Sequence, residues 1–497
     1  MNFRHAGRGM KLAFLPLLLS TTLLAPAVAR SAGQQAAPAK AQAANLQGLE
    51  AFVDGAVATG VANREVAGAV VVVVANGKVL FKKGYGFSDV AKGVPVDPDR
   101  TLFRPGSVSK LFTWTALMQL IEAGKVQLDN PVEKYIDFKM PTTAFDKPIL
   151  IRHLLTHTPG FEDTYVGMFS KSMSEFEPLG KFLATHIPGR VRQPGVEASY
   201  SNYGTALAGY IVQRVSGEDY ADYVDKHIFV PLGMTHSTFR EPVPQGWELA
   251  KSYDFADGRF AEKPGELITN IAPAGSLSAT GADMARFMLA HLQDGTLASG
   301  TILKPETARQ MRERLFTNTR SLPGLAHGFL EYRAASPRIV GHGGNTGYFH
   351  SDLMIAPETG IGVFVSVTGG DASSTARSEL MQLVTDRLFP TKPLPRWTGG
   401  PVDAFEGAYR PNRRSYAPGS ISASGLIRVR KDGDRELVME IRDKVIRWEQ
   451  VGPRLFQQIG EATTPLGPLG KLEFSGDGAD TRFSFEHQPY MLFRLVA

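Results

Sequence analysis

The sequence of 497 residues contains no cysteine. This absence excludes disulfide bonds, thiolate catalysis, cysteine-based zinc sites and lipid attachment at an N-terminal cysteine. Without disulfides, the folded chain must be stabilised by its hydrophobic core.

The sequence also lacks a strong net charge, because lysine and arginine exceed aspartate and glutamate by only five. Arg4, Arg8 and Lys11 supply three of these charges, which leaves only +2 for the rest of the chain. So mild an excess argues against a nucleic-acid partner. The length predicts two or three domains, and the composition, 43% hydrophobic and 21% charged, is that of a globular protein.

Long hydrophobic runs are missing except near the N-terminus. There, the basic residues precede an apolar stretch at 12–24, and Ala27-Val28-Ala29 forms a small-x-small cleavage site. This order predicts a signal peptide at 1–29, followed by a disordered leader at 30–45. The alternative is a membrane anchor, but the run is short and broken by polar residues. We therefore expect a periplasmic or secreted bacterial protein with no membrane span after cleavage.

The following segment predicts a helix at 46–61 and a hairpin. Strands at 70–74 and 78–81 flank Asn76-Gly77, which favours a type I′ turn. The first strand is a run of valines without alternation, so it should be covered on both faces.

Further along, the pattern predicts helices and then an antiparallel meander with turns at Gly343-Gly344 and 357–360. The expected helices are 203–216, 220–230, 281–292, 306–315 and 373–388, and the expected strands are 328–332, 339–342, 352–355 and 361–367. We predict a main domain at 46–389. A proline-rich linker at 390–403 then leads to a separate all-β unit at 404–497, a barrel or a sandwich.

One stretch combines a turn with chemically useful side chains. Pro105-Gly106 runs into a helix in which Ser107 and Lys110 are three residues apart and share a face. A lysine that is partly buried can lose its proton and then accept one from a serine hydroxyl. Taken alone, Ser-x-x-Lys is a weak signal, because an amphipathic helix with a surface lysine has the same pattern.

A second candidate stretch is Tyr200-Ser201-Asn202, directly before a predicted helix. Tyr200 can act as a general base if a nearby ammonium stabilises its phenolate, and Asn202 can donate and accept hydrogen bonds there. The alternative is an ordinary helix start, with Ser201 or Asn202 as the N-cap and Tyr200 in packing.

A third stretch is His342-Gly343-Gly344-Asn345, directly after a predicted strand. The glycines let a ligand lie against the backbone, where exposed N–H groups can hold an oxyanion. The alternative is a simple turn between two strands.

His153 and His157 are four residues apart and could face one metal ion. The glutamate of a His-Glu-x-x-His motif and an obvious third ligand are both missing. We therefore expect these histidines to bond to local backbone, with no metal and no organic cofactor in the protein.

Together the three stretches resemble the serine β-lactamase and penicillin-binding-protein superfamily, in order and in rough spacing. The branch they resemble most contains class C β-lactamases, D-aminopeptidases, D-alanyl-D-alanine carboxypeptidases and β-lactamase-like carboxylesterases. The similarity covers about residues 46–388, and the trailing β unit is similar to the lipocalin-like domains of some members. The resemblance implies an α/β (α+β) fold, with an antiparallel sheet flanked by helices and an all-helical subdomain.

The resemblance also implies a role for each site residue. Ser107 would be the nucleophile, Lys110 would take its proton, and Tyr200 would protonate the leaving group and activate water. For the substrate, Asn202 would hold the amide, and the N–H groups of Ser107 and Asn345, beside Gly343 and Gly344, would form the oxyanion hole. His342 stands where the family more often has lysine, and a histidine is a weaker anchor for the carboxylate of a β-lactam.

These observations predict an exported serine hydrolase that cleaves an ester or an amide through an acyl-enzyme on Ser107. The expected substrate is a small molecule or short peptide, with a D-residue suggested by the resemblance alone. The alternatives are a class C-like β-lactamase, and a penicillin- or peptidoglycan-binding protein that is acylated without turnover. Partner proteins are not indicated.

Overall fold

The computed structural model describes residues 45–141, 145–165, 167–170, 172–416, 425–441, 444–460 and 469–496. The predicted signal peptide at 1–29, and all of the predicted leader except its last residue, lie outside these residues. The described residues belong to one compact unit.

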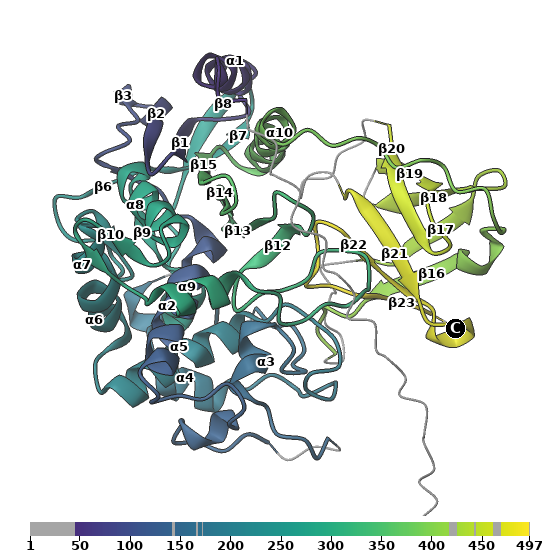
Figure 1. The fold of residues 1–497 in the computed structure, drawn as a ribbon. Coiled ribbons are helices and arrows are strands. Elements are labelled where there is room, and N and C mark those ends of the chain that lie inside the picture. The colour runs from purple at the N-terminus through teal and green to yellow at the C-terminus, as the bar shows by residue number, and fades with distance from the viewer. Residues whose placement is uncertain are drawn as a thin grey trace, which may run out of the picture. The chain divides into compact units, whose positions relative to one another are not determined.

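A seven-stranded antiparallel sheet forms the centre of the part of the chain predicted as the main domain, with strand order β12-β13-β14-β15-β1-β2-β3 (Figure 1). Its strands are β1 (Gly68–Ala75), β2 (Lys78–Asp89), β3 (Val94–Pro95), β12 (Leu330–Arg333), β13 (Ile339–Asn345), β14 (Phe349–Ala356) and β15 (Ile361–Thr368). The predicted hairpin is confirmed, because Asn76 and Gly77 join β1 to β2 with φ of 53° and 75°.

Strand β1 is buried along its whole length, as its unbroken valine run predicts. Val70, Val72 and Val74 face one hydrophobic core, and the alternate residues face the other. Helices α2 (Lys110–Glu122) and α8 (Gly281–Leu292) contribute to the first core, and α1 (Leu49–Ala62) and α10 (Asp371–Leu388) to the second. The sheet therefore has helices on both faces.

A mostly helical insertion lies between β4 and β12. Its helices are α3 (Ile151–Leu155), α4 (Leu179–Thr185), α5 (Asn202–Ser216), α6 (Tyr220–Val224), α7 (Val230–Leu232) and α9 (Pro305–Arg312). Short strand pairs accompany them: β4 (Thr101–Leu102) with β6 (Glu248–Leu249), β5 (Ser237–Thr238) with β9 (Ser278–Ala279), β7 (Ser252–Ala256) with β8 (Arg259–Lys263), and β10 (Thr296–Leu297) with β11 (Gly300–Thr301). The sequence pattern did not predict these pairs, most of which are too short to show alternation.

The predicted turn at Gly343-Gly344 is wrong. Strand β13 continues to Asn345, and Gly343 and Gly344 pair with Asp352 and Ser351 of β14. A glycine pair resembles a turn in sequence, but here the missing side chains let another segment approach the strand.

The C-terminal region is a closed antiparallel barrel, which settles the choice between barrel and sandwich. Its strands are β16 (Gly407–Pro411), β17 (Ile427–Lys431), β18 (Glu436–Ile441), β19 (Lys444–Gln450), β20 (Leu455–Ile459), β21 (Lys471–Ser475), β22 (Arg482–Phe485) and β23 (Phe493–Leu495). Aromatic side chains such as Trp448, Phe456 and Phe483, all with 0% exposure, pack in its core.

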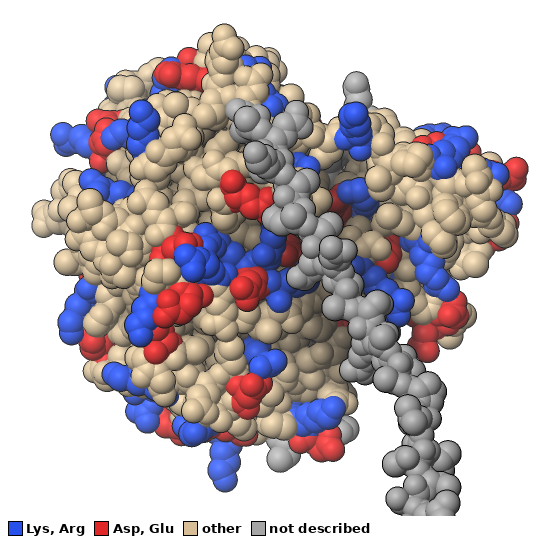
Figure 2. Space-filling view, viewed as in Figure 1, with Lys and Arg blue, Asp and Glu red and all other residues tan. Residues whose placement is uncertain are grey.

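Acidic and basic side chains are interspersed on the face shown in Figure 2, in line with the small net charge. Within the described part of the chain, none of the helices has the length and apolar character that crossing a bilayer requires.

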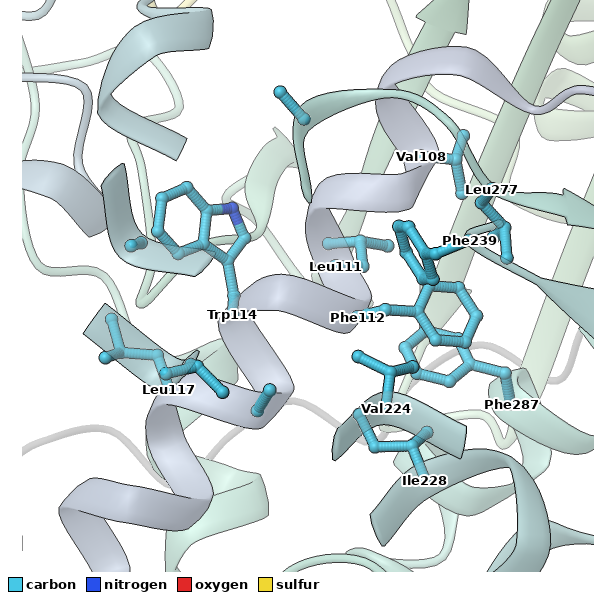
Figure 3. Packing of buried hydrophobic residues seen from close by; sticks show 14 of the residues in the cluster. Val108, Leu111, Phe112, Trp114, Leu117, Val224, Ile228, Phe239, Leu277 and Phe287 are labelled. Atoms are coloured by element: carbon cyan, nitrogen blue, oxygen red, sulfur yellow. The ribbon is translucent and has the colours of Figure 1, made fainter. Parts of the chain in front are cut away.

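Helix α2 is held in place by a cluster of buried apolar side chains (Figure 3). The ring of Phe112 stacks on that of Phe287, with centroids 3.9 Å apart and planes at 23°. The ring of Phe239, which directly follows β5, packs edge-on against the ring of Phe112, with centroids 6.2 Å apart. This packing fixes the helix that carries Lys110.

We predict that Phe112→Ala lowers the free energy of unfolding by about 3–5 kcal/mol, because it removes a buried ring and leaves a cavity. Urea unfolding measures the change. Val230→Ala is the control, since Val230 is 74% exposed and its truncation should change stability by at most about 0.5 kcal/mol. A loss below about 1 kcal/mol for Phe112→Ala would contradict the assigned packing.

Candidate active site

Ser107 lies in a 3₁₀ turn, η1 (Gly106–Ser109), that leads into α2. Gly106 has a φ of 55°, a left-handed conformation that glycine adopts without strain. In a 3₁₀ turn, side chains three residues apart eclipse each other. Lys110 Nζ accordingly lies 3.0 Å from Ser107 Oγ.

Strand β13 passes against this turn at very short range. A Cβ on Gly344 would lie 2.0 Å from the carbonyl oxygen of Pro105, and one on Gly106 would lie 2.9 Å from the amide nitrogen of Asn345. Only glycine fits at both positions. The backbone segments that carry the N–H groups of Ser107 and Asn345 are thereby brought side by side.

Lys110 is completely buried, with 0% of its surface exposed. Its Nζ donates a hydrogen bond to the carbonyl oxygen of Ala274 at 2.5 Å. Burial lowers the pKa of Lys110 well below its usual range, the guanidinium of Arg413 lowers it further, and Asp163 opposes both effects. A neutral amine has a lone pair that can accept the hydroxyl proton of Ser107.

Tyr200 lies on the loop before α5. Ser201 is the N-cap, since its hydroxyl accepts a hydrogen bond from the backbone N–H of Gly204 at 3.0 Å. The Tyr200 ring centroid lies 5.1 Å from Lys110 Nζ. Burial raises the pKa of Tyr200, whereas a hydrogen bond with the Ser107 hydroxyl and the charge of Arg413 lower it. The helix-start alternative and the proximity to Ser107 are therefore both realised in one short segment.

His342 is buried on β13, with its ring centroid 5.9 Å from that of Tyr200. Its Nδ1 donates to the carbonyl oxygen of Gly343 at 2.6 Å, so Nε2 carries the lone pair of the neutral ring. Within the described chain this Nε2 has no hydrogen-bond partner. Burial, followed by the effect of Lys110, lowers the pKa of His342 to about 3. His342 is therefore neutral at physiological pH.

His153 bonds to local backbone, as expected, but the expectation is wrong for His157, which bonds to the distant segment before α5. His153 Nδ1 accepts from the N–H of Leu150 at 3.0 Å, and His157 Nδ1 accepts from the N–H of Ser201 at 3.2 Å. The ring of His157 also stacks on that of Tyr200, with centroids 4.3 Å apart. The described residues contain no group of three or more histidine, aspartate or glutamate side chains placed to hold a metal ion.

A cavity of about 1180 Å³ opens onto Ser107, Tyr200 and His342. Among its lining residues are Ser107, Tyr200, Asn202, His342, Gly343 and Asn345. The structure thus places six of the eight predicted site residues at one cavity, and Lys110 lies directly beside Ser107. Gly344 acts instead at the close approach of β13 to η1.

The cavity also has lining residues that the sequence did not indicate. Arg413 and Tyr490 come from the C-terminal region, and Asp163 and Tyr165 come from the loop after α3. No short motif connects these positions, because they meet only through packing of the barrel region. A buried serine–lysine pair, a nearby phenol and apposed backbone N–H groups together define a site suited to nucleophilic acyl transfer.

The comparisons with known proteins agree with this class of site. The chain belongs to the β-lactamase family, because the sequence profile described as Beta-lactamase matches residues 53–385. Penicillin-binding protein 4 of Amycolatopsis lactamdurans is 30% identical over 293 residues, which cover 57% of this chain and 76% of that protein.

Two solved structures share the fold. The D-amino acid amidase from Ochrobactrum anthropi SV3, in complex with L-phenylalanine amide, is 27% identical with a TM-score of 0.56 and covers 68% of this chain and 97% of its own. The octameric penicillin-binding protein homologue from Pyrococcus abyssi has a TM-score of 0.59, 24% identity, and coverage of 90% of this chain and 100% of its own. The predicted fold class is thereby confirmed, barrel included.

We predict that His342 stays neutral, with its proton on Nδ1, between pH 8 and pH 5, because its folded pKa of about 3 lies well below this window. ¹⁵N NMR of histidine-labelled protein, with His342→Asn for assignment, measures the state. In the unfolded chain a histidine protonates near 6.5, so this residue makes stability fall as the pH drops below that value. Imidazolium shifts for His342 above pH 5 would contradict the assignment.

Proposed function

We propose that this chain is an exported serine hydrolase that cleaves an ester or amide bond through an acyl-enzyme on Ser107. The observation that carries the proposal is the 3.0 Å approach of Lys110 Nζ to Ser107 Oγ, with the amine wholly buried. A buried amine is a competent base because desolvation disfavours its charged form.

In acylation, the Ser107 hydroxyl gives its proton to Lys110 as Oγ attacks the substrate carbonyl. The oxyanion is held by the N–H groups of Ser107 and Asn345, which β13 and η1 place on facing segments. Tyr200 then gives its phenol proton to the leaving group and recovers one from Lys110. The proton released by Ser107 is thus passed through Lys110 and Tyr200 to the leaving group, and both residues return to their starting protonation states.

In deacylation, water enters in place of the leaving group. It passes a proton to Tyr200 as Tyr200 passes its own to Lys110, and the hydroxide attacks the acyl carbonyl. Lys110 finally returns a proton to Ser107 Oγ as the acid leaves. Asn202, at the cavity wall, is placed to hold the amide of a peptide substrate.

The substrate we propose is a short peptide or amide, with a D-residue, or a carboxylic ester. The likeness to a D-amino acid amidase supports the amide of a D-amino acid. The likeness to a penicillin-binding protein favours a second candidate, acylation by penicillin or peptidoglycan without turnover. β-Lactamase activity is less favoured, because the neutral His342 offers no charge to the β-lactam carboxylate.

We predict that the wild-type protein turns over D-aminoacyl p-nitroanilides or short-chain p-nitrophenyl esters faster than nitrocefin. Ser107→Ala should lower kcat by about 10⁴-fold or more, because it removes the nucleophile. Steady-state kinetics measure turnover, and mass spectrometry locates the acyl group on the Ser107 peptide.

An acyl-enzyme that forms with one of these substrates or with penicillin and is not hydrolysed would favour the penicillin-binding candidate. Equal labelling of wild type and Ser107→Ala by an acylating probe would contradict both candidates, because both place the acyl group on Ser107.

We also propose that the chain is exported and that its signal peptide is cleaved after Ala29, the last residue of the small-x-small site Ala27-Val28-Ala29. N-terminal sequencing of the protein from the periplasmic fraction of an expressing bacterium should begin at Arg30. Recovery of chains that begin at Met1 from the membrane fraction would contradict cleavage.

A further inference from the structure

Residues of the C-terminal region contact the loop that carries Tyr200. The backbone N–H of Tyr200 donates to the carbonyl oxygen of Tyr490 at 3.1 Å. Asn412 Nδ2 donates to the carbonyl oxygen of Ala198 at 2.8 Å, and Arg494 forms an ion pair with Glu197. The barrel region therefore helps to fix the position of the active-site phenol.

Arg413, which follows β16, reaches the site itself. Its Nε donates to Asp163 Oδ2 at 3.0 Å and its Nη2 donates to the hydroxyl of Tyr165 at 2.9 Å. Its Cζ lies 4.6 Å from the centroid of the Tyr200 ring. Two hydrogen bonds on a planar group hold the guanidinium in one orientation.

The groups that face Tyr200 come from several elements. They are Lys110 on α2, His157 after α3, His342 on β13, Tyr165 and Asp163 on the loop after α3, and Arg413 and Tyr490 from the C-terminal region. The pKa values of Lys110, His157 and His342 are all lowered, with burial as the largest cause in each case. Arg413 differs from these three groups: burial lowers its pKa, but the Asp163 carboxylate and nearby tyrosines outweigh that effect, so its pKa is raised and it stays a cation at neutral pH.

We propose that Arg413 is a positioning residue of the active site: from the C-terminal barrel region it supplies the fixed positive charge that favours both the phenolate of Tyr200 and the neutral amine of Lys110. His342 is neutral and offers no such charge, so the charge comes from the C-terminal region. Asp163 anchors the guanidinium and partly offsets its charge. This inference rests on the proposed function, because it concerns the same proton transfers.

The proposal fixes the direction of a pH effect. The positive charge of Arg413 lowers the pKa values of Lys110 and Tyr200, so removing it raises both. The reactive state needs Lys110 neutral, and the rate therefore falls as the pH drops below the pKa of this coupled pair. Arg413→Met should move this acid limb to higher pH by about one unit. A shift of this size is expected because the Arg413 charge lies 4.6 Å from the centroid of the Tyr200 ring and is partly offset by Asp163.

The experiment measures the second-order rate constant with which a fluorophosphonate labels Ser107, from about pH 5 to pH 10. In this reaction Oγ attacks phosphorus, fluoride leaves, and the hydroxyl proton passes to Lys110. The probe needs no knowledge of the natural substrate. Ser107→Ala controls for labelling elsewhere.

Three further variants separate an electrostatic role from a structural one. Arg413→Lys keeps the charge and should restore at least half of the shift. Asp163→Asn keeps the shape but removes the opposing charge, so it should move the acid limb to lower pH. Arg494→Met removes a different ion pair of the barrel region, that with Glu197, and should leave the limb in place.

A profile for Arg413→Met that is unshifted, or lowered equally at every pH, overturns the inference while the proposed function stands. A shift of the same size in Arg494→Met also overturns it, because loosening of the barrel would then be the cause. Labelling of Ser107→Ala at the wild-type rate overturns the proposed function and the inference together.

Discussion

The site depends on one contact, that of the wholly buried amine of Lys110 with the partly buried hydroxyl of Ser107. An ammonium group buried without a carboxylate partner costs several kcal/mol, so the fold favours the neutral amine. The bond from Nζ to the carbonyl oxygen of Ala274 satisfies one N–H and leaves the lone pair for the hydroxyl. The same burial that would destabilise a charged lysine thus favours the neutral amine that the proposed mechanism needs.

Three structural constraints shape the site around this contact. The apolar cluster around Phe112 fixes α2, and the eclipsed geometry of η1 aligns Ser107 with Lys110. The close approach of β13 at Gly344 places the backbone of Asn345 beside that of Ser107. The third constraint is independent of the other two, because moving the strand outward by one side chain would separate the facing backbone segments of Ser107 and Asn345 while leaving the serine–lysine pair intact. The barrel region adds a fourth constraint, because Tyr490 bonds to the backbone of Tyr200.

Much of the fold could be predicted, because local signals and packing agree there. The valine run at 70–74 gave a doubly covered strand, and Asn76-Gly77 gave its turn. Gly343-Gly344 was wrongly predicted to be a turn, because a glycine pair occurs both in turns and in strands that another segment approaches closely. Each site motif could also be explained structurally, as an amphipathic helix, a helix start or a turn. Only the three motifs together predicted a common active site. Arg413 left no signal, since an arginine 213 residues beyond Tyr200 in the sequence is placed only by domain packing.

The proposed mechanism requires Lys110 to be a neutral amine in the folded protein at pH 7. ¹³C NMR of protein labelled at the ε-carbon of lysine measures this directly, with Lys110→Arg to assign the resonance. The account predicts an ε-carbon shift typical of a free amine at pH 7, converting to the ammonium shift only on acidification. An ammonium shift at pH 7 that titrates only near the usual lysine pKa would contradict it.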